Sequence, residues 1–253
     1  TSLLHCLRSN EKMLRQTADG PQEWQFDEYV SAAGWIDADR VLMASETGLW
    51  DMNLRTGARD LVTPLEADNP VTRSNDGRAD PWGGFWIGTM GIHAEAGAGA
   101  IYRYYRGTLR QLYGPAHIPN AICFAPDRSC AYYTGTTSGV VMRQPLDSTH
   151  GWPKGDPQVF VDLRDQDSAP DGAVTDAQGT LWLARWGGAC VSAFAPDGSW
   201  IRDIALPAAH ITCPAFGGAD LRDLLVTSAT DGLSETDAAA HAHNGKTFCI
   251  AET

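Results

Sequence analysis

The chain has 253 residues, of which 43% are hydrophobic and 20% charged, a composition typical of a globular protein with a large core. Its 31 acidic and 19 basic residues give a formal net charge of −12, which argues against nucleic acid or an anionic membrane surface as a partner. No run approaches the roughly 18 apolar residues that a membrane-spanning helix needs, so we expect no membrane association.

Short runs rich in Val, Ile, Tyr, Phe and Trp alternate with glycine and proline, which predicts many short strands joined by turns. A turn led by an aspartate and followed by an apolar strand recurs along the chain. The lead residues are Asp37, Asp80, Asp127, Asp176 and Asp220. Their spacings of 43, 47, 49 and 44 residues fit the length of a four-stranded propeller blade. The best helical candidate is Leu233–His243.

The period predicts an all-β protein, a six-bladed β-propeller that forms a single domain over residues 1–253. A blade of about 45 residues gives between five and six blades for this length, and propellers close their ring with strands from both ends of the chain. We therefore expect parts of the first and last blades to be missing from this chain. A β-sandwich with coincidental turns is the alternative.

Six cysteines are scattered along the chain and none forms a CxxC pair. In a chain of this size we expect buried, reduced thiols, with disulfides as the alternative. This predicts a cytoplasmic protein. The six are Cys6, Cys123, Cys130, Cys190, Cys213 and Cys249.

Polar residues stand just upstream of three of the recurring turns. Asn75, Asn120 and Asp171 precede the second, third and fourth lead aspartates by five, seven and five residues. Taken singly, Asn75-Asp76-Gly77 and Pro170-Asp171-Gly172 are common turn formers. Their recurrence in register favours a site, because the inner strands of three blades would bring them to equivalent places.

The chemistry of these side chains predicts a site for one divalent metal ion. Amide and carboxylate oxygens suit Ca²⁺, Mg²⁺ or Mn²⁺, and carboxylates also accept Zn²⁺. One charged ligand with neutral amides would leave the metal Lewis-acidic and open to water. Arg73, beside the first of the three, could orient substrate oxygens or stabilise a developing oxyanion.

The sequence resembles the sugar-lactonase family that includes gluconolactonase and regucalcin, and the resemblance runs through most of the chain. It is strongest where the family reads R-x-N-D-G, D-P and G-T-M. The matching segments are Arg73-Ser74-Asn75-Asp76-Gly77, Asp80-Pro81, Gly88-Thr89-Met90, Ile118-Pro119-Asn120, Pro170-Asp171-Gly172 and Phe216-Gly217-Gly218. The resemblance implies a six-bladed propeller with one divalent metal ion in its central channel.

The resemblance also implies a ligand set of Glu, Asn and Asp. The last two match Asn120 and Asp171, and Asp171 would also be the general base for water. Counting back from Arg73 by the family's spacing places the Glu upstream of residue 1, so either this chain lacks it or the metal site differs. The nearest local match, Asp19, is interpreted as a turn residue. The family's N-G is Asn120-Ala121 here, and its D-T or D-S is Gly135-Thr136.

The substrate contacts implied by the resemblance are Arg73 and Asn75, with a further polar contact after the G-T-M motif at His93 or Glu95. These residues predict metal-dependent hydrolysis of a sugar lactone, a small-molecule substrate, to its aldonic acid. One alternative is hydrolysis of non-sugar lactones or phosphotriesters on the same metal centre. The other is a non-catalytic metal-binding propeller.

Overall fold

The structure is a computed structural model that describes residues 4–7, 11–17, 19–233 and 242–251. The protein is all-β, as predicted, and the described residues form strands and turns apart from the short 3-10 helix η2 (Thr136–Ser138). Contacts between residues divide the chain into two compact units, residues 2–119 and residues 120–253. Within the described ranges, no helix has the length and apolar character needed to cross a membrane.

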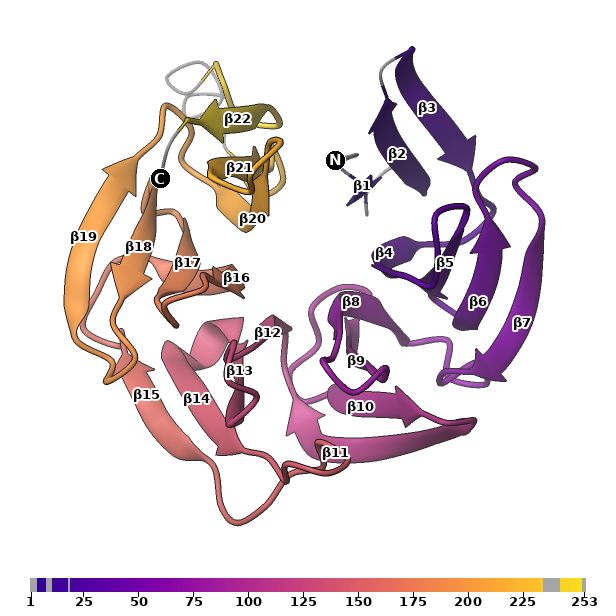
Figure 1. The fold of residues 1–253 in the computed structure, drawn as a ribbon, viewed down its shortest axis with the longest axis horizontal. Helices are drawn as coiled ribbons and strands as arrows, with labels where there is room; N and C mark the ends of the chain where they lie inside the picture. The colour runs from indigo at the N-terminus through magenta and orange to yellow at the C-terminus, as the bar shows by residue number, and fades with distance from the viewer. Residues whose placement is uncertain (1–3, 8–10, 18, 234–241, 252–253) are drawn as a thin grey trace. The chain divides into compact units, whose positions relative to one another are not determined.

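The N-terminal unit, residues 2–119, contains three antiparallel sheets in which consecutive strands are neighbours (Figure 1). The first sheet holds β1 to β3, the second β4 to β7 and the third β8 to β11. The strands are β1 (Leu4–Leu7), β2 (Lys12–Thr17), β3 (Gly20–Gln25), β4 (Val30–Trp35), β5 (Arg40–Ser45), β6 (Gly48–Asn53), β7 (Arg59–Pro64), β8 (Thr72–Ala79), β9 (Phe85–Gly91), β10 (Gly99–Tyr105) and β11 (Thr108–Ala116).

The C-terminal unit, residues 120–253, is built in the same way. Its described strands form one sheet of β12 to β15, a second of β16 to β19 and a third of β20 to β22. They are β12 (Pro119–Phe124), β13 (Cys130–Gly135), β14 (Val140–Pro145), β15 (Gln158–Asp162), β16 (Ala169–Thr175), β17 (Leu181–Trp186), β18 (Cys190–Phe194), β19 (Trp200–Ala205), β20 (Ile211–Gly217), β21 (Asp223–Ser228) and β22 (Thr247–Ile250).

The repeat predicted from the sequence is the first hairpin of the five sheets that start with β4, β8, β12, β16 and β20. Every lead aspartate lies in the connection between a first and a second strand, and the apolar run behind it is the second strand. The first and last sheets have three strands each among the described residues, which is compatible with the expectation that these two blades are incomplete.

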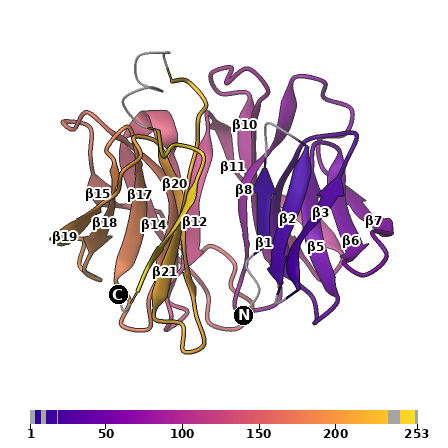
Figure 2. The ribbon, with the colours of Figure 1, turned by 90° about the horizontal axis from the view of Figure 1, so that it is seen from above.

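Both faces of the second strands β5, β9 and β17 are buried, which explains their continuous apolar sequences. On β5, Val41 and Met43 pack into one core cluster, while Ala44 packs into another on the opposite face. On β17, Leu183 and Ala184 are divided between two clusters in the same way. Within each unit the sheets therefore pack face to face, and Figure 2 shows them from the side.

The up-and-down order of the strands defines two ends of each sheet. The start of a first strand lies beside the end of the second, as the pairs Arg73 with Met90 and Ala169 with Trp186 show. We call this the upper end, and the end that carries the lead aspartates the turn end. The predicted metal and substrate residues belong to the upper ends of their sheets.

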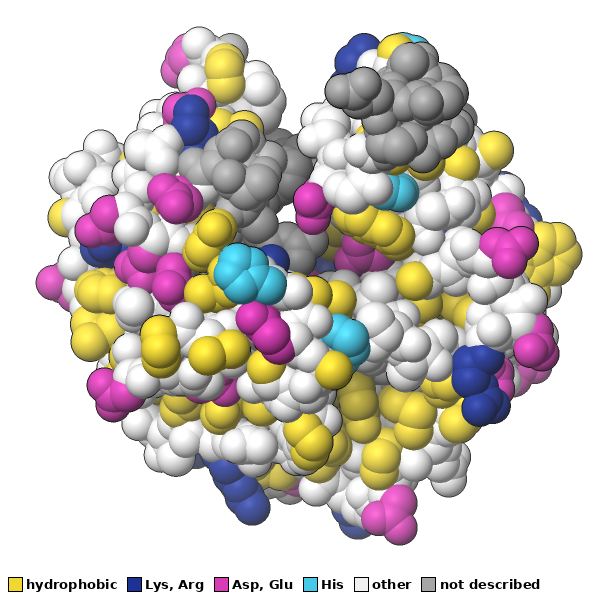
Figure 3. Space-filling model, turned by 180° about the vertical axis from the view of Figure 1, so that it is seen from behind, with side chains coloured by type: hydrophobic (Ala, Val, Ile, Leu, Met, Phe, Trp, Pro, Cys, Tyr) yellow, Lys and Arg dark blue, Asp and Glu magenta, His cyan; other side chains and the backbone are white. Residues whose placement is uncertain are grey.

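Acidic side chains are spread over the face drawn in Figure 3 and do not gather in one patch. Many of the basic residues form ion pairs with nearby acids. Arg40 contacts Asp37 and Asp51, and Arg164 contacts Asp162. The net negative charge is therefore distributed over this face and is not concentrated in one acidic patch.

Three smaller expectations have different outcomes. Asp19 lies in the turn between β2 and β3, as predicted. The helix predicted over Leu233–His243 falls largely on residues 234–241, outside the described residues. Five cysteines of the described residues are free, and the prediction that they are buried is confirmed for Cys123 and Cys130. Cys190 and Cys213 are only partly buried, and the prediction is wrong for Cys249, which is exposed on β22, the edge strand of its sheet.

Candidate functional site

Asn75, Asn120 and Asp171 occupy equivalent positions, near the starts of β8, β12 and β16. All three side chains are buried, although each carries a full set of polar atoms. Burial of a polar side chain is costly unless it has partners. Arg73 and Asn75 belong to the N-terminal unit, and Asn120 and Asp171 to the C-terminal unit.

Two of these residues lie at irregularities in strand pairing. The register of β8 against β9 shifts between Ser74 and Gly77, and that of β16 against β17 shifts between Pro170 and Ala173. The shifted residues are therefore Asn75-Asp76 and Asp171-Gly172. A β-bulge bends its strand and redirects a side chain, and bulges are frequent beside active sites.

The shift recurs in other sheets at the same height. It falls at Ser31 on β4 and at Thr212 on β20. Both are the second residue of a first strand, close to the places that Asn75 and Asp171 take on β8 and β16. The sheets thus share a bulge that presents a polar residue at the upper end, and the residue types differ from sheet to sheet.

The glycines of the two motifs permit close packing, at Gly172 between two sheets and at Gly77 within one sheet. A Cβ on Gly172 would lie 2.7 Å from the backbone oxygen of Thr212, and one on Gly77 would lie 2.8 Å from that of Trp86. Because these segments lie in strands, the interpretation of Asn75-Asp76-Gly77 and Pro170-Asp171-Gly172 as turn formers does not hold.

Arg73 is half-buried and its guanidinium is held from two sides. It lies over the ring of Tyr29, 5.6 Å from the centroid, and its Nη1 donates to the backbone oxygen of Ser74 at 3.1 Å. The hydroxyl of Ser74 in turn accepts a 2.7 Å hydrogen bond from Ser31. Arg73 is thus supported by β4 as well as by its own strand.

The side chain of Asn75 donates from Nδ2 to the backbone oxygen of Pro119 at 2.7 Å. This bond ties β8 to the residue that directly precedes Asn120 in the chain. Asn75, predicted as a substrate contact, therefore has a structural bond as well.

Asn120 donates from Nδ2 to Oγ1 of Thr136, at 2.7 Å, at the start of η2. This bond fixes the orientation of the amide and makes Oδ1 the atom suited to a metal ion. The next residue, Ala121, is fully buried and has a left-handed backbone with φ of 55°. A residue with a Cβ pays about 1–2 kcal/mol there, so the Ala121 backbone is strained beside a predicted ligand.

Asp171 lies next to Pro170, which pairs with the buried Arg185 on β17. Arg185 donates to Gln166 at 2.5 Å, Ser168 at 2.7 Å and Ser192 at 3.2 Å. Burial lowers the pKa of Arg185, and no carboxylate in the described part of the chain forms an ion pair with it. It anchors the segment that leads into β16.

His93 and Glu95 lie in the loop between β9 and β10 and differ in environment. His93 is exposed, whereas an oxygen of Glu95 accepts a hydrogen bond from the backbone nitrogen of His93 at 3.0 Å. Glu95 also packs closely on Gly91: a Cβ at position 91 would overlap the carboxylate of Glu95. The ring of His117 contacts the backbone oxygen of Ala94 at 2.8 Å. Glu95 shapes this loop, and His93 projects from it.

The donor atoms fit a hard divalent ion, but they do not complete a metal site. Asn120 and Asp171 start neighbouring sheets of one unit and offer an amide and a carboxylate oxygen. Over the described ranges, no group of three His, Cys, Asp or Glu residues is placed to hold a metal.

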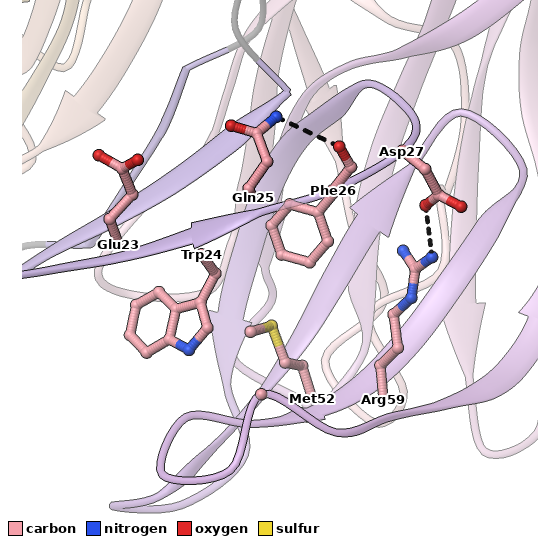
Figure 4. Close-up of a pocket in the computed structure, with 8 residues that line it drawn as sticks. Glu23, Trp24, Gln25, Phe26, Asp27, Met52 and Arg59 are labelled. Carbon is pink, nitrogen blue, oxygen red and sulfur yellow. Dashed lines mark hydrogen bonds and ion pairs between the residues drawn. The ribbon is translucent and has the colours of Figure 1, made fainter.

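A pocket of about 580 Å³ lies at the edge strand β3 (Figure 4). Trp24, Phe26 and Met52 point into it, while Glu23 and Gln25 point the other way. Its cation, Arg59, pairs with Asp27 at 2.9 Å and with Glu28 at 2.8 Å. None of the predicted site residues lines this pocket.

Known proteins similar to this chain cover nearly all of it. L-arabinolactonase of Azospirillum brasilense is 34% identical over 249 residues, covering 96% of this chain and 81% of that protein. The 6-deoxy-6-sulfogluconolactonase of Pseudomonas putida is 33% identical over 228 residues, covering 88% and 77%. The crystal structure of a calcium-binding protein, regucalcin, from Agrobacterium tumefaciens strain C58 superposes with a TM-score of 0.95 at 37% identity, covering 98% and 85%.

The family match spans residues 3–230, which include every residue predicted for the site. The motifs found in the sequence, the repeated hairpins and the similar proteins agree with it. The chain belongs to the SMP-30/gluconolactonase/LRE-like family.

Proposed function

We propose that this protein is a lactonase that opens a sugar lactone to its aldonic acid with the help of one divalent metal ion. The observation that carries the proposal is the placement of Asn75, Asn120 and Asp171 at equivalent upper-end positions, with Arg73 beside the first. The names of the similar lactonases support the substrate class.

In this proposal the six sheets are blades of one six-bladed propeller, and residues 1–253 form a single domain. The match to regucalcin over 98% of the chain supports it. A cytoplasmic location belongs to the same proposal and rests on the five free cysteines.

Asn120 and Asp171 would hold the metal through Oδ1 and a carboxylate oxygen, with a glutamate upstream of residue 1 as the third ligand. Calcium is one candidate, because the similar regucalcin is a calcium-binding protein; zinc, manganese and magnesium are the others. When bound, the metal would supply Lewis acidity toward the lactone carbonyl.

The side chains of the chain would do the remaining work. Asp171 would take a proton from the attacking water as general base and return it to the ring oxygen as the bond between the acyl carbon and that oxygen breaks. The product would be a hydroxy acid, which loses its acid proton to solvent and leaves as a carboxylate. Arg73, held over Tyr29, would orient the oxygens of the substrate. Between the two candidates after the G-T-M motif, we propose His93 as the substrate contact, because Glu95 is engaged within its loop.

The test is acid release from gluconolactone and xylonolactone, above the spontaneous rate, after chelation and readdition of Ca²⁺, Zn²⁺, Mn²⁺ or Mg²⁺. It is run on this chain and on the chain with the residues encoded before Thr1. We expect metal-restored turnover, with Asp171→Asn lowering kcat/KM by roughly 10²- to 10⁴-fold. Asn120→Ala should abolish turnover while the protein stays folded.

Asp176→Asn is the matched control, since Asp176 is a carboxylate of the same sheet at its turn end. It should leave kcat/KM within a factor of about 2. Full activity of Asp171→Asn would overturn the assignment of the base. Turnover of phosphotriesters or non-sugar lactones alone would overturn the substrate class, and metal binding without turnover would indicate a binding protein.

A further inference from the structure

A partly buried glutamate links three strands of the sheet that carries Arg73. Glu66 lies in the connection between β7 and β8, and its carboxylate accepts hydrogen bonds from three hydroxyl groups. The distances are 2.5 Å to Oγ1 of Thr72 on β8, 3.0 Å to Oγ1 of Thr89 on β9 and 2.6 Å to Oη of Tyr102 on β10.

Two of these bonds frame Arg73. Thr72 directly precedes Arg73 on β8, and Thr89 directly precedes Met90, the residue that pairs with Arg73 across the strands. Both threonines are about 1% exposed, so water does not compete for their hydroxyls. One carboxylate therefore holds the backbone on both sides of the Arg73–Met90 pair.

Glu66 is held by neutral donors alone. Among the described residues it forms no ion pair, and three hydroxyls fill three of its roughly four acceptor sites. Hydrogen bonds to an ionised acceptor are about twice as strong as neutral ones. The pKa of the Tyr102 hydroxyl is raised, first by burial and then by its bond to Glu66, so Tyr102 remains a donor.

The backbone of Glu66 is strained. Its φ of 48° is left-handed, a conformation that is unfavourable for a residue with a Cβ. Strained backbone tends to occur where a functional geometry demands it. The strained residue is also the one whose carboxylate accepts the three hydrogen bonds.

We propose that Glu66 is a positioning residue that acts through Arg73, setting the place from which Arg73 reaches the substrate. The inference rests on the proposed lactonase function. It adds a residue that does not itself touch the substrate, 7 positions upstream of Arg73 and outside the motifs of the sequence.

Asp51 offers a matched control in the same unit. Its partly buried carboxylate, on β6, accepts from Nη1 of Arg40 at 3.0 Å. Neither residue adjoins Arg73 or Tyr29 in the chain, and neither pairs with Arg73 across a strand. Asp51→Asn should therefore disturb packing without changing how Arg73 is placed.

The experiment is a double-mutant cycle in kcat/KM for the lactone that the wild-type protein hydrolyses best. Alone, Glu66→Gln should lower kcat/KM about 10-fold, mainly through KM, because a misplaced binding group loses part of its contribution. In the Arg73→Ala background the same change should cost less than about 2-fold, since residues that act as a unit are not additive. Asp51→Asn should leave kcat/KM within about 2-fold in both backgrounds.

A second pair of variants tests the hydroxyl bond directly. Thr72→Val removes the hydroxyl donor at similar volume and should reproduce part of the loss in kcat/KM that is expected for Glu66→Gln. Thr72→Ser keeps the hydroxyl, so its kcat/KM should stay close to that of the wild-type protein. Circular dichroism and thermal unfolding establish that each variant is folded, and if Glu66→Gln does not fold, Thr72→Val takes its place in the cycle.

Losses that multiply in the double variant would overturn the inference, because they would mean that Glu66 supports the fold and not Arg73. Unchanged kcat/KM in Glu66→Gln would overturn it as well. If the wild-type protein hydrolyses no lactone under any metal condition, the proposed function falls and the role of Glu66 falls with it. The lactonase proposal stands if the losses multiply or if Glu66→Gln leaves kcat/KM unchanged, because the wild-type protein is active in both outcomes.

Discussion

The turns between β8 and β9 and between β16 and β17 have the same backbone geometry but different chemistry. In the first, Oδ1 of Asp80 accepts from the backbone nitrogens of Trp82 and Gly84, both at 2.9 Å. In the second, Oδ1 of Asp176 accepts from the nitrogens two and four residues on, at 2.9 and 2.8 Å. One carboxylate oxygen thus serves the same purpose in both turns.

The second carboxylate oxygen distinguishes them. Oδ2 of Asp80 lies 2.6 Å from Nε of Arg103, and neither side chain is exposed. Oδ2 of Asp176 accepts instead from the indole nitrogen of Trp182 at 3.0 Å. The aspartate recurs in the sequence because its Oδ1 accepts the hydrogen bonds of the turn backbone. The recurrence does not predict which group contacts Oδ2.

The largest effect expected from this difference is that of Asp80→Asn. The change leaves the guanidinium of Arg103 buried without its carboxylate, so it should lower the free energy of unfolding by about 3–5 kcal/mol. Urea denaturation measures it. Adding Arg103→Met should recover part of the loss, because an apolar replacement of the whole pair is often tolerated. A loss as small as that of an exposed turn would show that the pair contributes little.

The second-largest change in the free energy of unfolding is expected at the last residue of the first turn. Gly84 and Thr180 donate equivalent backbone nitrogens to the lead aspartates. A Cβ on Gly84 would lie 3.0 Å from Nε of Arg103 and closer still to the carboxylate of Asp80. We expect Gly84→Ala to cost about 1–3 kcal/mol through overpacking.

Thr180→Ala is the control for that change, since this turn already accommodates a side chain. It should alter the free energy of unfolding by less than about 0.5 kcal/mol. Equal losses in the two variants, measured by the same denaturation, would show that the ion pair does not restrict the space at Gly84.

Asp176→Asn should have a smaller effect than either change at the first turn. The asparagine keeps an acceptor for the backbone nitrogens, but its Nδ2 would face the indole N–H of Trp182, donor against donor. The loss of one hydrogen bond predicts about 1 kcal/mol. In a double-mutant cycle with Trp182→Phe the two losses should be less than additive; full additivity would contradict the Asp176–Trp182 bond.

The hairpins could be predicted from sequence because their signal is local. The lead aspartate, the turn and the apolar second strand lie within about ten residues of one another, which is the range over which turn chemistry acts. The shifts in register at Asn75-Asp76 and Asp171-Gly172 could not, because a bulge is a property of two paired strands. The sequence therefore indicated that Asn75 and Asp171 recur. The shifts in strand register explain why these residues lie inside strands and not in turns.

Glu66 could not be found from the sequence for a related reason. Its three donors lie 6, 23 and 36 residues away along the chain, on three different strands. The segment around it, Glu66-Ala67-Asp68-Asn69-Pro70, has the composition of an ordinary surface loop. Only the arrangement of β8, β9 and β10 shows that the carboxylate of Glu66 bonds to the residues that precede Arg73 and Met90.

The smallest effect is expected at a third turn of the same kind, between β12 and β13. The carboxylate of Asp127 is exposed, and the side-chain and backbone hydrogen bonds of Ser129 hold its pKa below the usual value of 3.8. Because the folded pKa is the lower one, this contribution to stability is present above pH 3.8 and is lost as the pH falls through the folded value.

Ser129→Ala should raise the pKa of Asp127 toward 3.8, which can be followed by NMR of the side-chain carboxyl carbon. Asp162 is the internal reference, because Arg164 lowers its pKa to about 2 independently of Ser129. Stability at neutral pH should change far less than in Asp80→Asn, since exposed charges are screened by solvent. An unchanged pKa for Asp127 would mean that the backbone bond alone sets it.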